Sequence, residues 1–177
     1  MDGCALAVPR TRLDDHLVSH LDASDRAHYE IVGVDISDEK LPAGLHDVRF
    51  LHKDFLDPEV LAEVPRADVV VDLVAYANPS VYVTSPLETF ELNFLQNLEI
   101  VKLCVEHGKK LVQYSTCEVY GDLDLDTDEQ FTEESPYRPR TPYNASKAGG
   151  DHAVRAYHET FGLPISITNC ANNYGLY

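Results

Sequence analysis

The fold is decided by residues 68–115, which read DVVVDLVAYANPSVYVTSPLETFELNFLQNLEIVKLCVEHGKKLVQYS. A β-branched run, Asp68–Ala75, opens the segment and a second one, Lys110–Ser115, closes it. Between them, Pro86–Glu106 repeats apolar residues at helical spacing. The three valines at 69–71 are continuously apolar, as expected for a parallel strand that helices cover on both faces. The segment therefore predicts a strand–helix–strand unit of a parallel sheet.

The same alternation continues towards both ends of the chain. Further strands are expected at Glu30–Ile36, Val48–Leu51 and Ile165–Cys170, and a second long helix at Tyr143–Phe161. This order of elements predicts an α/β fold, a Rossmann-type doubly wound parallel sheet that forms one domain over residues 1–177. In such a sheet, ligands bind at the carboxyl ends of the strands.

The composition is that of a globular domain with an acidic surface. Apolar residues make up 44% of the chain, and 30 acidic against 14 basic side chains give a formal net charge of −16. This charge argues against nucleic acid or an anionic membrane as a partner, because both attract basic surfaces. No signal-peptide pattern, no apolar run of membrane length and no cysteine spacing typical of a metal site or a disulfide framework is found. We therefore expect a cytoplasmic protein without a metal site.

The sequence YNASK, residues 143–147, stands at the start of the second long helix. Residues four apart share one helix face, so the phenol of Tyr143 and the ammonium of Lys147 are expected to lie side by side. The pKa of a free tyrosine is about 10, and a nearby ammonium favours the phenolate, which brings the phenol towards use as a base. Lysine in this position can also hydrogen-bond a ribose hydroxyl. Such pairs occur by chance on many helices, so the function of this one depends on its surroundings.

Polar side chains also follow three of the expected strands. Thr116 and Glu118 come directly after the strand Lys110–Ser115, where this fold turns side chains towards the ligand. Threonine can hydrogen-bond a substrate hydroxyl, and glutamate can move a proton. Asp35 can accept hydrogen bonds from an adenosine ribose and favours NAD over NADP by repelling a 2′-phosphate, and Asp54 is a candidate for the adenine amino group. Both acids equally suit turn or cap positions, and loop glutamates are often only solvated.

Three motifs in a fixed order carry a family resemblance. They are STCEVYG at 115–121, TPYNASKAG at 141–149 and TNCANNYG at 168–175. Together they resemble the nucleotide-sugar 4,6-dehydratases of the dTDP-glucose 4,6-dehydratase type. These enzymes belong to the extended short-chain dehydrogenase/reductases, in the NAD-dependent epimerase/dehydratase family. The resemblance covers the chain from His16 to its end. Pro86–Asn97, together with the first motif, looks more like the UDP-glucuronate decarboxylases and UDP-apiose/xylose synthases.

The resemblance implies a reaction and a role for each site residue. Tyr143 takes the proton of the sugar 4-hydroxyl while a hydride passes to NAD, Lys147 holds the ribose, and Thr116 binds the same sugar oxygen. Oxidation at C4 acidifies the C5 hydrogen, which Glu118 removes; in a dehydratase an acid then expels the C6 hydroxyl as water, and the hydride returns to C6. Asn172 is implied as a further substrate contact. The implied cofactor-binding residues, besides Tyr143 and Lys147, are Asp35, Ile36, Asp54, Phe55, Val74, Ala75, Tyr76 and Asn173.

One departure from the family pattern concerns the acid that expels water. The dehydratases carry Asp where this chain has Cys117, and a thiol with a pKa near 8.5 is a weaker acid than a carboxyl. The position therefore bears on water loss and leaves C4 oxidation untouched. The apiose synthases have Cys here and the decarboxylases Ser, which fits decarboxylation instead. Against that, residues 143–149 and 169–175 resemble the dehydratases more.

A second departure concerns the phosphate-binding glycines of the family. Counted back from His16, they would fall on Val8, Thr11 and Asp14, and none of these is glycine. Side chains there would crowd the phosphates, and the charge of Asp14 would oppose them. We therefore expect a degenerate first strand and glycine loop within residues 1–15. The chain also stops before nearly all of the family's substrate domain, so the fold is expected to be incomplete at both ends.

The leading hypothesis is thus an NAD-dependent nucleotide-sugar lyase of the dTDP-glucose 4,6-dehydratase type. A UDP-glucuronate decarboxylase or UDP-apiose/xylose synthase is the alternative within enzymes, and a catalytically inactive fragment is the alternative of another class. A nucleotide sugar is the expected substrate. A homodimer through the helices at 86–106 and 143–161 is the expected assembly.

Overall fold

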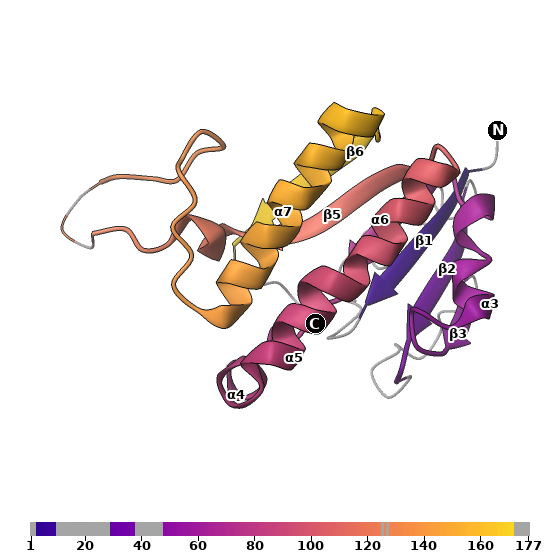
Figure 1. The fold of residues 1–177 in the computed structure, drawn as a ribbon, viewed down its shortest axis with the longest axis horizontal. Helices are drawn as coiled ribbons and strands as arrows, with labels where there is room; N and C mark the ends of the chain where they lie inside the picture. The colour runs from indigo at the N-terminus through magenta and orange to yellow at the C-terminus, as the bar shows by residue number, and fades with distance from the viewer. Residues whose placement is uncertain (1–2, 10–28, 38–47, 125, 127, 172–177) are drawn as a thin grey trace.

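The computed structural model describes residues 3–9, 29–37, 48–124, 126 and 128–171 (Figure 1). Six strands of this part of the chain form one parallel sheet in the order β3-β2-β1-β4-β5-β6. In chain order they are β1 Gly3–Pro9, β2 Tyr29–Asp35, β3 Val48–His52, β4 Val69–Leu73, β5 Lys110–Thr116 and β6 Ile165–Cys170. The predicted Rossmann-type parallel sheet is therefore confirmed.

The first strand occupies the centre of the sheet. Gly3–Pro9 pairs in parallel with β2 on one side, where Ala5 is opposite Ile31, and with β4 on the other, where Ala5 is opposite Val69. A central strand gains ladder hydrogen bonds from both neighbours, so it forms even where its own sequence gives a weak signal. The glycine-loop positions after it lie outside the described residues, so the expected degenerate first strand and glycine loop within residues 1–15 stay a prediction.

The strand order reverses between β1 and β4, because the chain moves outward to β3 and then returns past β1 to β4. The connections at such a reversal leave on opposite sides of the sheet, which opens a crevice at the carboxyl ends of the two strands. In this sheet that position corresponds to the backbone ends of β1, at Pro9, and of β4, at Leu73.

The helices differ in one respect from the prediction. The expected single helix at Pro86–Glu106 consists of three pieces, of which the middle one has the wider π-helical turn. A short helix that was not predicted, α4 Pro79–Thr84, precedes them. The helices, in chain order, are α3 Pro58–Leu61, η1 Val64–Arg66, α4 Pro79–Thr84, α5 Pro86–Phe90, η2 Glu91–Gln96, α6 Asn97–Glu106, η3 Cys117–Tyr120 and α7 Pro142–Phe161.

The second long helix, α7, begins and ends where the sequence provides stop signals. The side chain of Thr141 accepts a hydrogen bond from the backbone N–H of Asn144 at 3.1 Å and so caps the helix, and Pro142 occupies its first position. Gly162 ends the helix with φ +71°, a left-handed conformation that favours glycine. The helix start is thereby fixed one residue before Tyr143.

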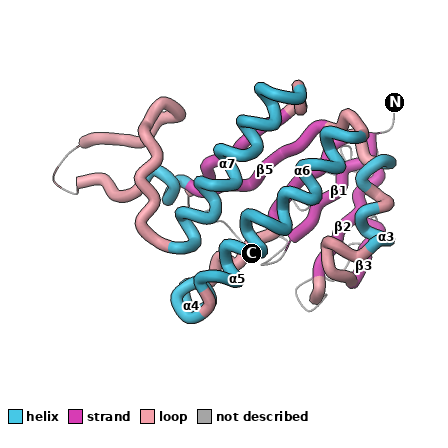
Figure 2. The backbone as a smooth tube through the Cα atoms, in the orientation of Figure 1, coloured by secondary structure: helices cyan, strands magenta, loops and turns pink. Residues whose placement is uncertain are grey.

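The described helices form a layer over one face of the sheet (Figures 1 and 2). The apolar core lies between the layers and includes Val32, Val70 and Leu111 from the strands, with Ile100 and Val154 from the helices. The connections from β1 to β2 and from β2 to β3 lie largely outside the described residues. None of the described helices is long and apolar enough to cross a membrane.

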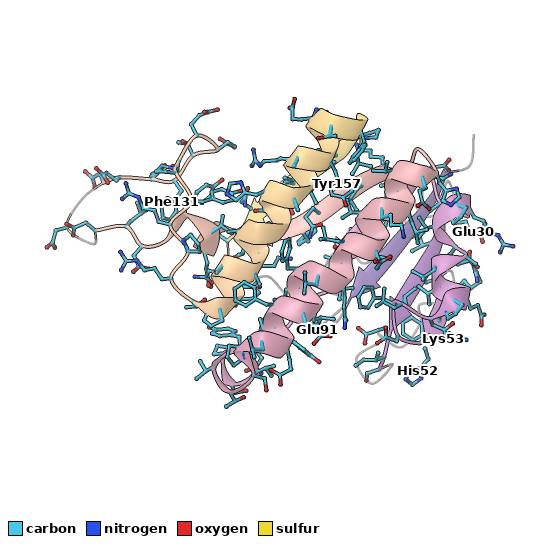
Figure 3. All side chains as sticks on the ribbon, in the orientation of Figure 1. Glu30, His52, Lys53, Glu91, Phe131 and Tyr157 are labelled. Atoms are coloured by element: carbon cyan, nitrogen blue, oxygen red, sulfur yellow. The ribbon has the colours of Figure 1, made fainter. Side chains whose placement is uncertain are left out.

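The long segment between η3 and α7 extends away from the sheet as a loop (Figure 1). Phe131, labelled in Figure 3, comes from this loop and packs with Tyr137 against a small second core of Val119, Tyr120 and Ala148. This core ties the loop to η3 and to the first turns of α7, next to the carboxyl end of β5.

Candidate active site

Four of the predicted catalytic residues meet at the carboxyl end of β5. Thr116 is the last residue of the strand, and Cys117 and Glu118 lie in the η3 turn that follows it. Tyr143 reaches the same place from the first turn of α7, where Thr116 hydrogen-bonds its phenol and the charges of Glu118 and Cys117 act on it. Residues separated by some 25 positions in the chain are thus assembled around one phenolic oxygen.

The electrostatic environment of Tyr143 keeps its phenol protonated. Burial of the ring, followed by the negative charge of Glu118, raises the pKa of Tyr143 to about 12, while the hydrogen bond from Thr116 opposes the rise. The expected lowering of the Tyr143 pKa by the Lys147 ammonium is therefore outweighed in this structure by burial and by the charge of Glu118.

Lys147 is subject instead to the charges of two buried carboxyl groups, Asp72 and Asp151. Its side chain is 3% exposed, and Asp72 and Asp151 are 1% and 0% exposed. Burial lowers the pKa of Lys147 and raises those of both acids, and the charges of Lys147 and the two acids act on one another in the opposite direction. The charges of two buried carboxyl groups thus act on one buried ammonium, and sequence reasoning missed both acids.

Asp151 also connects the site to three neighbouring elements. Its Oδ2 accepts hydrogen bonds from Ser115 at 2.7 Å in β5, from Tyr137 at 3.0 Å in the loop and from Asn169 at 3.4 Å in β6. Asn169 in turn donates to the backbone carbonyl of Thr116 at 3.4 Å. The carboxylate therefore holds the strand end that carries Thr116 against α7.

The η3 turn presents Cys117 and Glu118 in different surroundings. Glu118 is exposed, and its backbone N–H donates to the Thr116 hydroxyl at 3.3 Å, which caps the turn. Burial, followed by the charge of Glu118, raises the pKa of the half-buried Cys117 thiol. The thiol consequently keeps its proton at neutral pH. Gly121 closes the turn at φ +89° beneath the Arg138 carbonyl, where a side chain would collide with the loop.

One aromatic residue at the site was missed. The ring of Tyr82, from the short helix α4, stacks on that of Tyr143 with centroids 5.6 Å apart and an interplanar angle of 17°. The only sequence signal for this helix is Asn78-Pro79, since Asn78 caps it and proline is favoured at a first helical position. Nothing in the sequence showed that its tyrosine would reach the start of α7.

The segment after β4, predicted to line the crevice, is held by hydrogen bonds from two asparagines, one in η2 and one in α6. Val74 and Ala75 are buried and Tyr76 is half-buried. The side chain of Asn97 donates to the Val74 carbonyl at 3.0 Å, and Asn93 accepts from the Tyr76 N–H at 2.6 Å. The position of these three residues beside β1 and α7 is consistent with the role that the sequence assigned to them.

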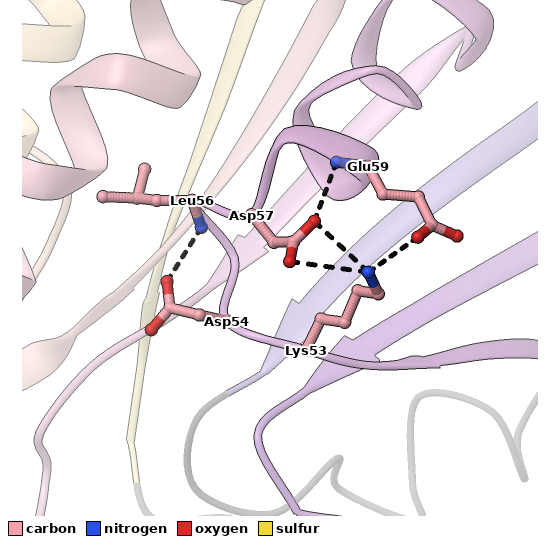
Figure 4. Close-up of polar contacts among 5 residues, drawn as sticks. All are labelled: Lys53, Asp54, Leu56, Asp57 and Glu59. Carbon is pink, nitrogen blue, oxygen red and sulfur yellow. Dashed lines mark hydrogen bonds and ion pairs between the residues drawn. The ribbon is translucent and has the colours of Figure 1, made fainter.

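The residues predicted for the adenosine end lie at the carboxyl ends of β2 and β3. Asp35 ends β2, and its Oδ1 accepts a hydrogen bond from the Ser37 N–H at 2.9 Å; the next residue, Ile36, is exposed. Asp54 follows β3 and is exposed, and Figure 4 shows its Oδ1 accepting from the Leu56 N–H at 2.9 Å. The Phe55 side chain is buried in the core. Both acids thus stabilise turns and also face the edge of the sheet at which a nucleotide is expected.

The protein resembles dinucleotide-dependent sugar enzymes along nearly its whole length. Residues 15–177 match the model of the NAD dependent epimerase/dehydratase family. The chain belongs to this family. A relative within it is dTDP-glucose 4,6-dehydratase of Mycobacterium tuberculosis, 38% identical over 131 residues, which are 73% of this chain and 40% of that protein. The chain thus spans less than half the length of that relative.

Two solved structures are similar to this epimerase/dehydratase chain. One is the dTDP-glucose 4,6-dehydratase DesIV of Streptomyces venezuelae, described with NAD and TYD bound, which is 32% identical with a TM-score of 0.83. The alignment covers 98% of this chain and 57% of the DesIV chain. The dTDP-glucose 4,6-dehydratase of Bacillus anthracis, in complex with NAD, is 27% identical with a TM-score of 0.81, and the alignment covers 99% of this chain and 56% of that one.

Some predicted site residues of this family member lie outside the described residues. These are Thr11 and Asp14, at the positions of the phosphate-binding glycines, and Asn172 and Asn173, after β6. Val8 belongs to β1 by its backbone, and its side chain is likewise outside the description.

Proposed function

We propose that this chain is the NAD-binding part of a nucleotide-sugar lyase of the dTDP-glucose 4,6-dehydratase type. The observation that carries the proposal is the assembly of Tyr143, Thr116 and Glu118 at the end of β5, one helical turn from the buried Lys147. The same three side chains provide a group for the sugar hydroxyl proton, a hydrogen-bond partner for its oxygen and a base for a neighbouring carbon. The identity to curated dTDP-glucose 4,6-dehydratases supports it.

NAD fits the described part of the crevice. Lys147 makes no hydrogen bond within the described residues, so its ammonium retains donors for the hydroxyls of a ribose. Asp35, at the end of β2, places a carboxylate where an adenosine ribose is held in this fold. When bound, NAD supplies a hydride acceptor at C4 of the sugar and a donor for its return. Thr116, Tyr143 and Lys147 would lie along its nicotinamide half.

Proton transfers in the proposed reaction belong to three side chains. The ionised phenol of Tyr143 takes the proton of the sugar 4-hydroxyl, while Thr116 donates a hydrogen bond to the same sugar oxygen and orients it. Once C4 is a ketone, the hydrogen at C5 is acidic, and Glu118 removes it. The thiol of Cys117, whose raised pKa keeps it protonated, then donates a proton to the C6 hydroxyl as that group leaves as water.

Cys117 also supports a second candidate, decarboxylation of UDP-glucuronate. Loss of carbon dioxide from a 4-keto uronate requires prior C4 oxidation, for which Tyr143 would take the hydroxyl proton and NAD would accept the hydride, and it needs no acid at C6. A thiol with a raised pKa is a poor acid, so it limits dehydration more than decarboxylation. The two candidates therefore share every step up to the ketone and differ in the step that Cys117 influences.

Product analysis distinguishes these candidates. The full gene product is incubated with dTDP-glucose and, separately, with UDP-glucuronate labelled with carbon-13 at its carboxyl. A 4-keto-6-deoxy sugar from the first supports the dehydratase, and labelled carbon dioxide from the second supports the decarboxylase. Tyr143→Phe abolishes either product, whereas Tyr157→Phe, a tyrosine packed on the core from the same helix, retains it. Conversion of neither sugar nucleotide would contradict both candidates.

NAD binding tests the alternative of an inactive fragment. Calorimetry with the 177-residue chain and NAD is expected to give a binding isotherm that Lys147→Met weakens. A flat titration would favour the inactive reading, because the residues at the positions of the glycine loop would then exclude the pyrophosphate.

We also propose that the chain forms a homodimer in the cytoplasm. Large apolar side chains are exposed on the helices predicted for the interface: Leu87 in α5, Leu95 in η2 and Phe161 in α7. A second copy that covers them removes this surface from water. Sedimentation at micromolar concentration tests the assembly, and a monomer would contradict it. The proposed location in the cytoplasm has a separate basis: the cysteines are scattered along the sequence, which suits a reducing compartment.

A further inference from the structure

Two free cysteines lie at the carboxyl ends of neighbouring strands, beside the proposed active site. Thr116, the last residue of β5, is opposite Cys170, the last residue of β6, in the parallel register. Cys117 follows Thr116 directly and opens the η3 turn. Both thiols are free and half-buried. The sheet thus brings together two thiols from distant parts of the sequence.

The strand register places these two cysteines within the span of a disulfide bond. Neighbouring strands lie about 4.8 Å apart, and each residue advances about 3.3 Å along its strand. At one step beyond the partner of Cys170, where Cys117 stands, a Cα is therefore expected about 6 Å from that of Cys170. The Cα atoms that a disulfide joins are usually about 4.4–6.8 Å apart. The backbone spacing therefore suits a bond between Cys117 and Cys170.

The electrostatics of the described cysteines agree with this pairing. Burial raises the pKa of Cys117 most, and the charges of Glu118 and of Cys170 raise it further, so the two thiols sense each other. A raised pKa makes the thiolate scarcer but intrinsically more nucleophilic. Cys104 differs, because it is 0% exposed and burial, followed by the charge of Asp72, raises its pKa to about 12. Cys104 is therefore expected to be inert in the folded protein.

We propose that Cys117 and Cys170 form a reversible disulfide that switches off the proposed lyase reaction, with a low-molecular-weight disulfide such as oxidised glutathione as the oxidant. One cysteine thiolate attacks a sulfur of the oxidant and releases one glutathione. The second cysteine thiolate attacks the protein sulfur of this mixed disulfide and releases the other glutathione. The cysteines lose two protons and two electrons, and the oxidant becomes two thiols. In a reducing compartment such a bond is transient.

The switch rests on the proposed function, because it acts on the side chain that was assigned to the loss of water. A sulfur of Cys117 in a disulfide carries no proton, so it has none to donate to the C6 hydroxyl as that group leaves. The bond also fastens the η3 turn, which carries Glu118, to the end of β6. The disulfide itself depends only on the fold and not on the reaction.

Peptide mapping by mass spectrometry tests the disulfide without any substrate. The full gene product is incubated with oxidised glutathione, denatured in an alkylating reagent and digested. The peptide with Cys117 is expected to be linked to the peptide with Cys170, and dithiothreitol is expected to separate them. Cys104 is expected to be alkylated, which makes it the internal control. A Cys117 that is alkylated, carries only glutathione or is linked to another cysteine would overturn the proposal.

Cys170→Ser is the matched variant, because it removes one partner of the bond and no group assigned to the reaction. At a fixed ratio of reduced to oxidised glutathione, diluting the pool about 10-fold is expected to raise the ratio of internal disulfide to free thiols about 10-fold, because its formation releases two glutathiones. In Cys170→Ser, Cys117 can form only a mixed disulfide, which releases one glutathione, so its modified fraction is expected to stay constant. The same response in both proteins would contradict an internal bond.

Activity shows whether the bond acts as a switch. Oxidised full gene product is expected to form the 4-keto-6-deoxy sugar from dTDP-glucose roughly 100-fold more slowly than reduced protein, the low end of what a general acid contributes, and dithiothreitol is expected to restore the rate. Linked protein that works at the reduced rate would refute the switch. If even the reduced protein forms no product, the proposed function fails, while the mapping still decides whether the disulfide exists.

Discussion

Replacing Lys147 with methionine removes the positive charge that acts on the buried carboxyl groups of Asp72 and Asp151. Removal of one partner from a buried contact ion pair costs roughly 3–5 kcal/mol. This range is an upper bound here, because Lys147 forms no contact ion pair with either acid within the described residues. Asp151 keeps its hydrogen bonds from Ser115, Tyr137 and Asn169, and Asp72 keeps that from the Val74 N–H. These bonds place the expected loss near the lower end, about 3 kcal/mol, which corresponds to a fall in Tm of roughly 6–12 °C for a chain of this length.

The loss is expected to depend on pH. Burial raises the pKa values of Asp72 and Asp151 in the folded protein, and the charge of Lys147 holds both back. An acid whose folded pKa lies above its unfolded value of about 3.9 contributes most stability below that value and loses the contribution as the pH rises through the folded pKa. Without Lys147 both folded pKa values rise further, so the deficit of Lys147→Met should be larger at pH 8 than at pH 5.

Urea unfolding at both pH values, followed by circular dichroism, measures this deficit. Lys102→Met is the matched control, because Lys102 is exposed and its one ion pair among the described residues is with Glu99 at 3.6 Å. It should change stability by less than about 0.5 kcal/mol. Adding Asp72→Asn to Lys147→Met removes one unpaired charge and should recover part of the loss at pH 8. A Lys147→Met protein as stable as the Lys102→Met control at pH 8 would refute the assignment of Lys147 as the shared cation.

Three further variants test the site and its surroundings. Gly121→Ala puts a Cβ 2.7 Å from the Arg138 carbonyl at a residue with φ +89°, and it should lower the free energy of unfolding by at least about 2 kcal/mol, as measured by thermal unfolding. Gly108→Ala is the control, because the added Cβ meets open space, and it should cost about 1 kcal/mol. Equal losses would contradict the described turn. Cys117→Asp supplies a stronger acid and should raise the rate of 4-keto-6-deoxy sugar formation from dTDP-glucose relative to Cys117→Ser, and no difference would exclude position 117 as the acid. Leu87→Glu replaces an apolar side chain that is 80% exposed by a charged one, and it should shift the sedimenting species from the proposed dimer towards monomer. An unchanged sedimentation profile would place α5 outside the interface.

The strands and the catalytic assembly were predictable because their signals are local. The β-branched runs gave β4, β5 and β6 to within two residues at each end, and the helix spacing gave α7. The family resemblance implied that Tyr143 and Thr116 act on the same sugar oxygen, and in the structure Thr116 hydrogen-bonds the Tyr143 phenol. For these elements, each segment carries enough information about its own conformation.

The parts that could not be predicted depend on contacts between distant residues. Asp72 approaches Lys147 only because β4 and β5 are neighbours in the sheet and α7 packs over them. Asp151 was within reach of sequence reasoning, since it follows Lys147 by four positions on the same helix. The π-turn around Asn93 has no local signature, because apolar spacing is compatible with a regular helix throughout Pro86–Glu106. The bounds of the first strand had a similarly weak signal in the sequence, since its pairing with β2 and β4 stabilises it.

The raised pKa of Tyr143 bears on the proposed proton transfers. Burial of the ring and the negative charge of Glu118 both disfavour the phenolate, which makes it scarce but strongly basic. When the phenolate takes the proton of the sugar hydroxyl, its repulsion with that charge disappears, which favours the transfer. In the proposed reaction Glu118 acts only after this step, because the C5 hydrogen becomes acidic only once C4 is a ketone. The chemistry of the sugar therefore sets the order in which the two bases act.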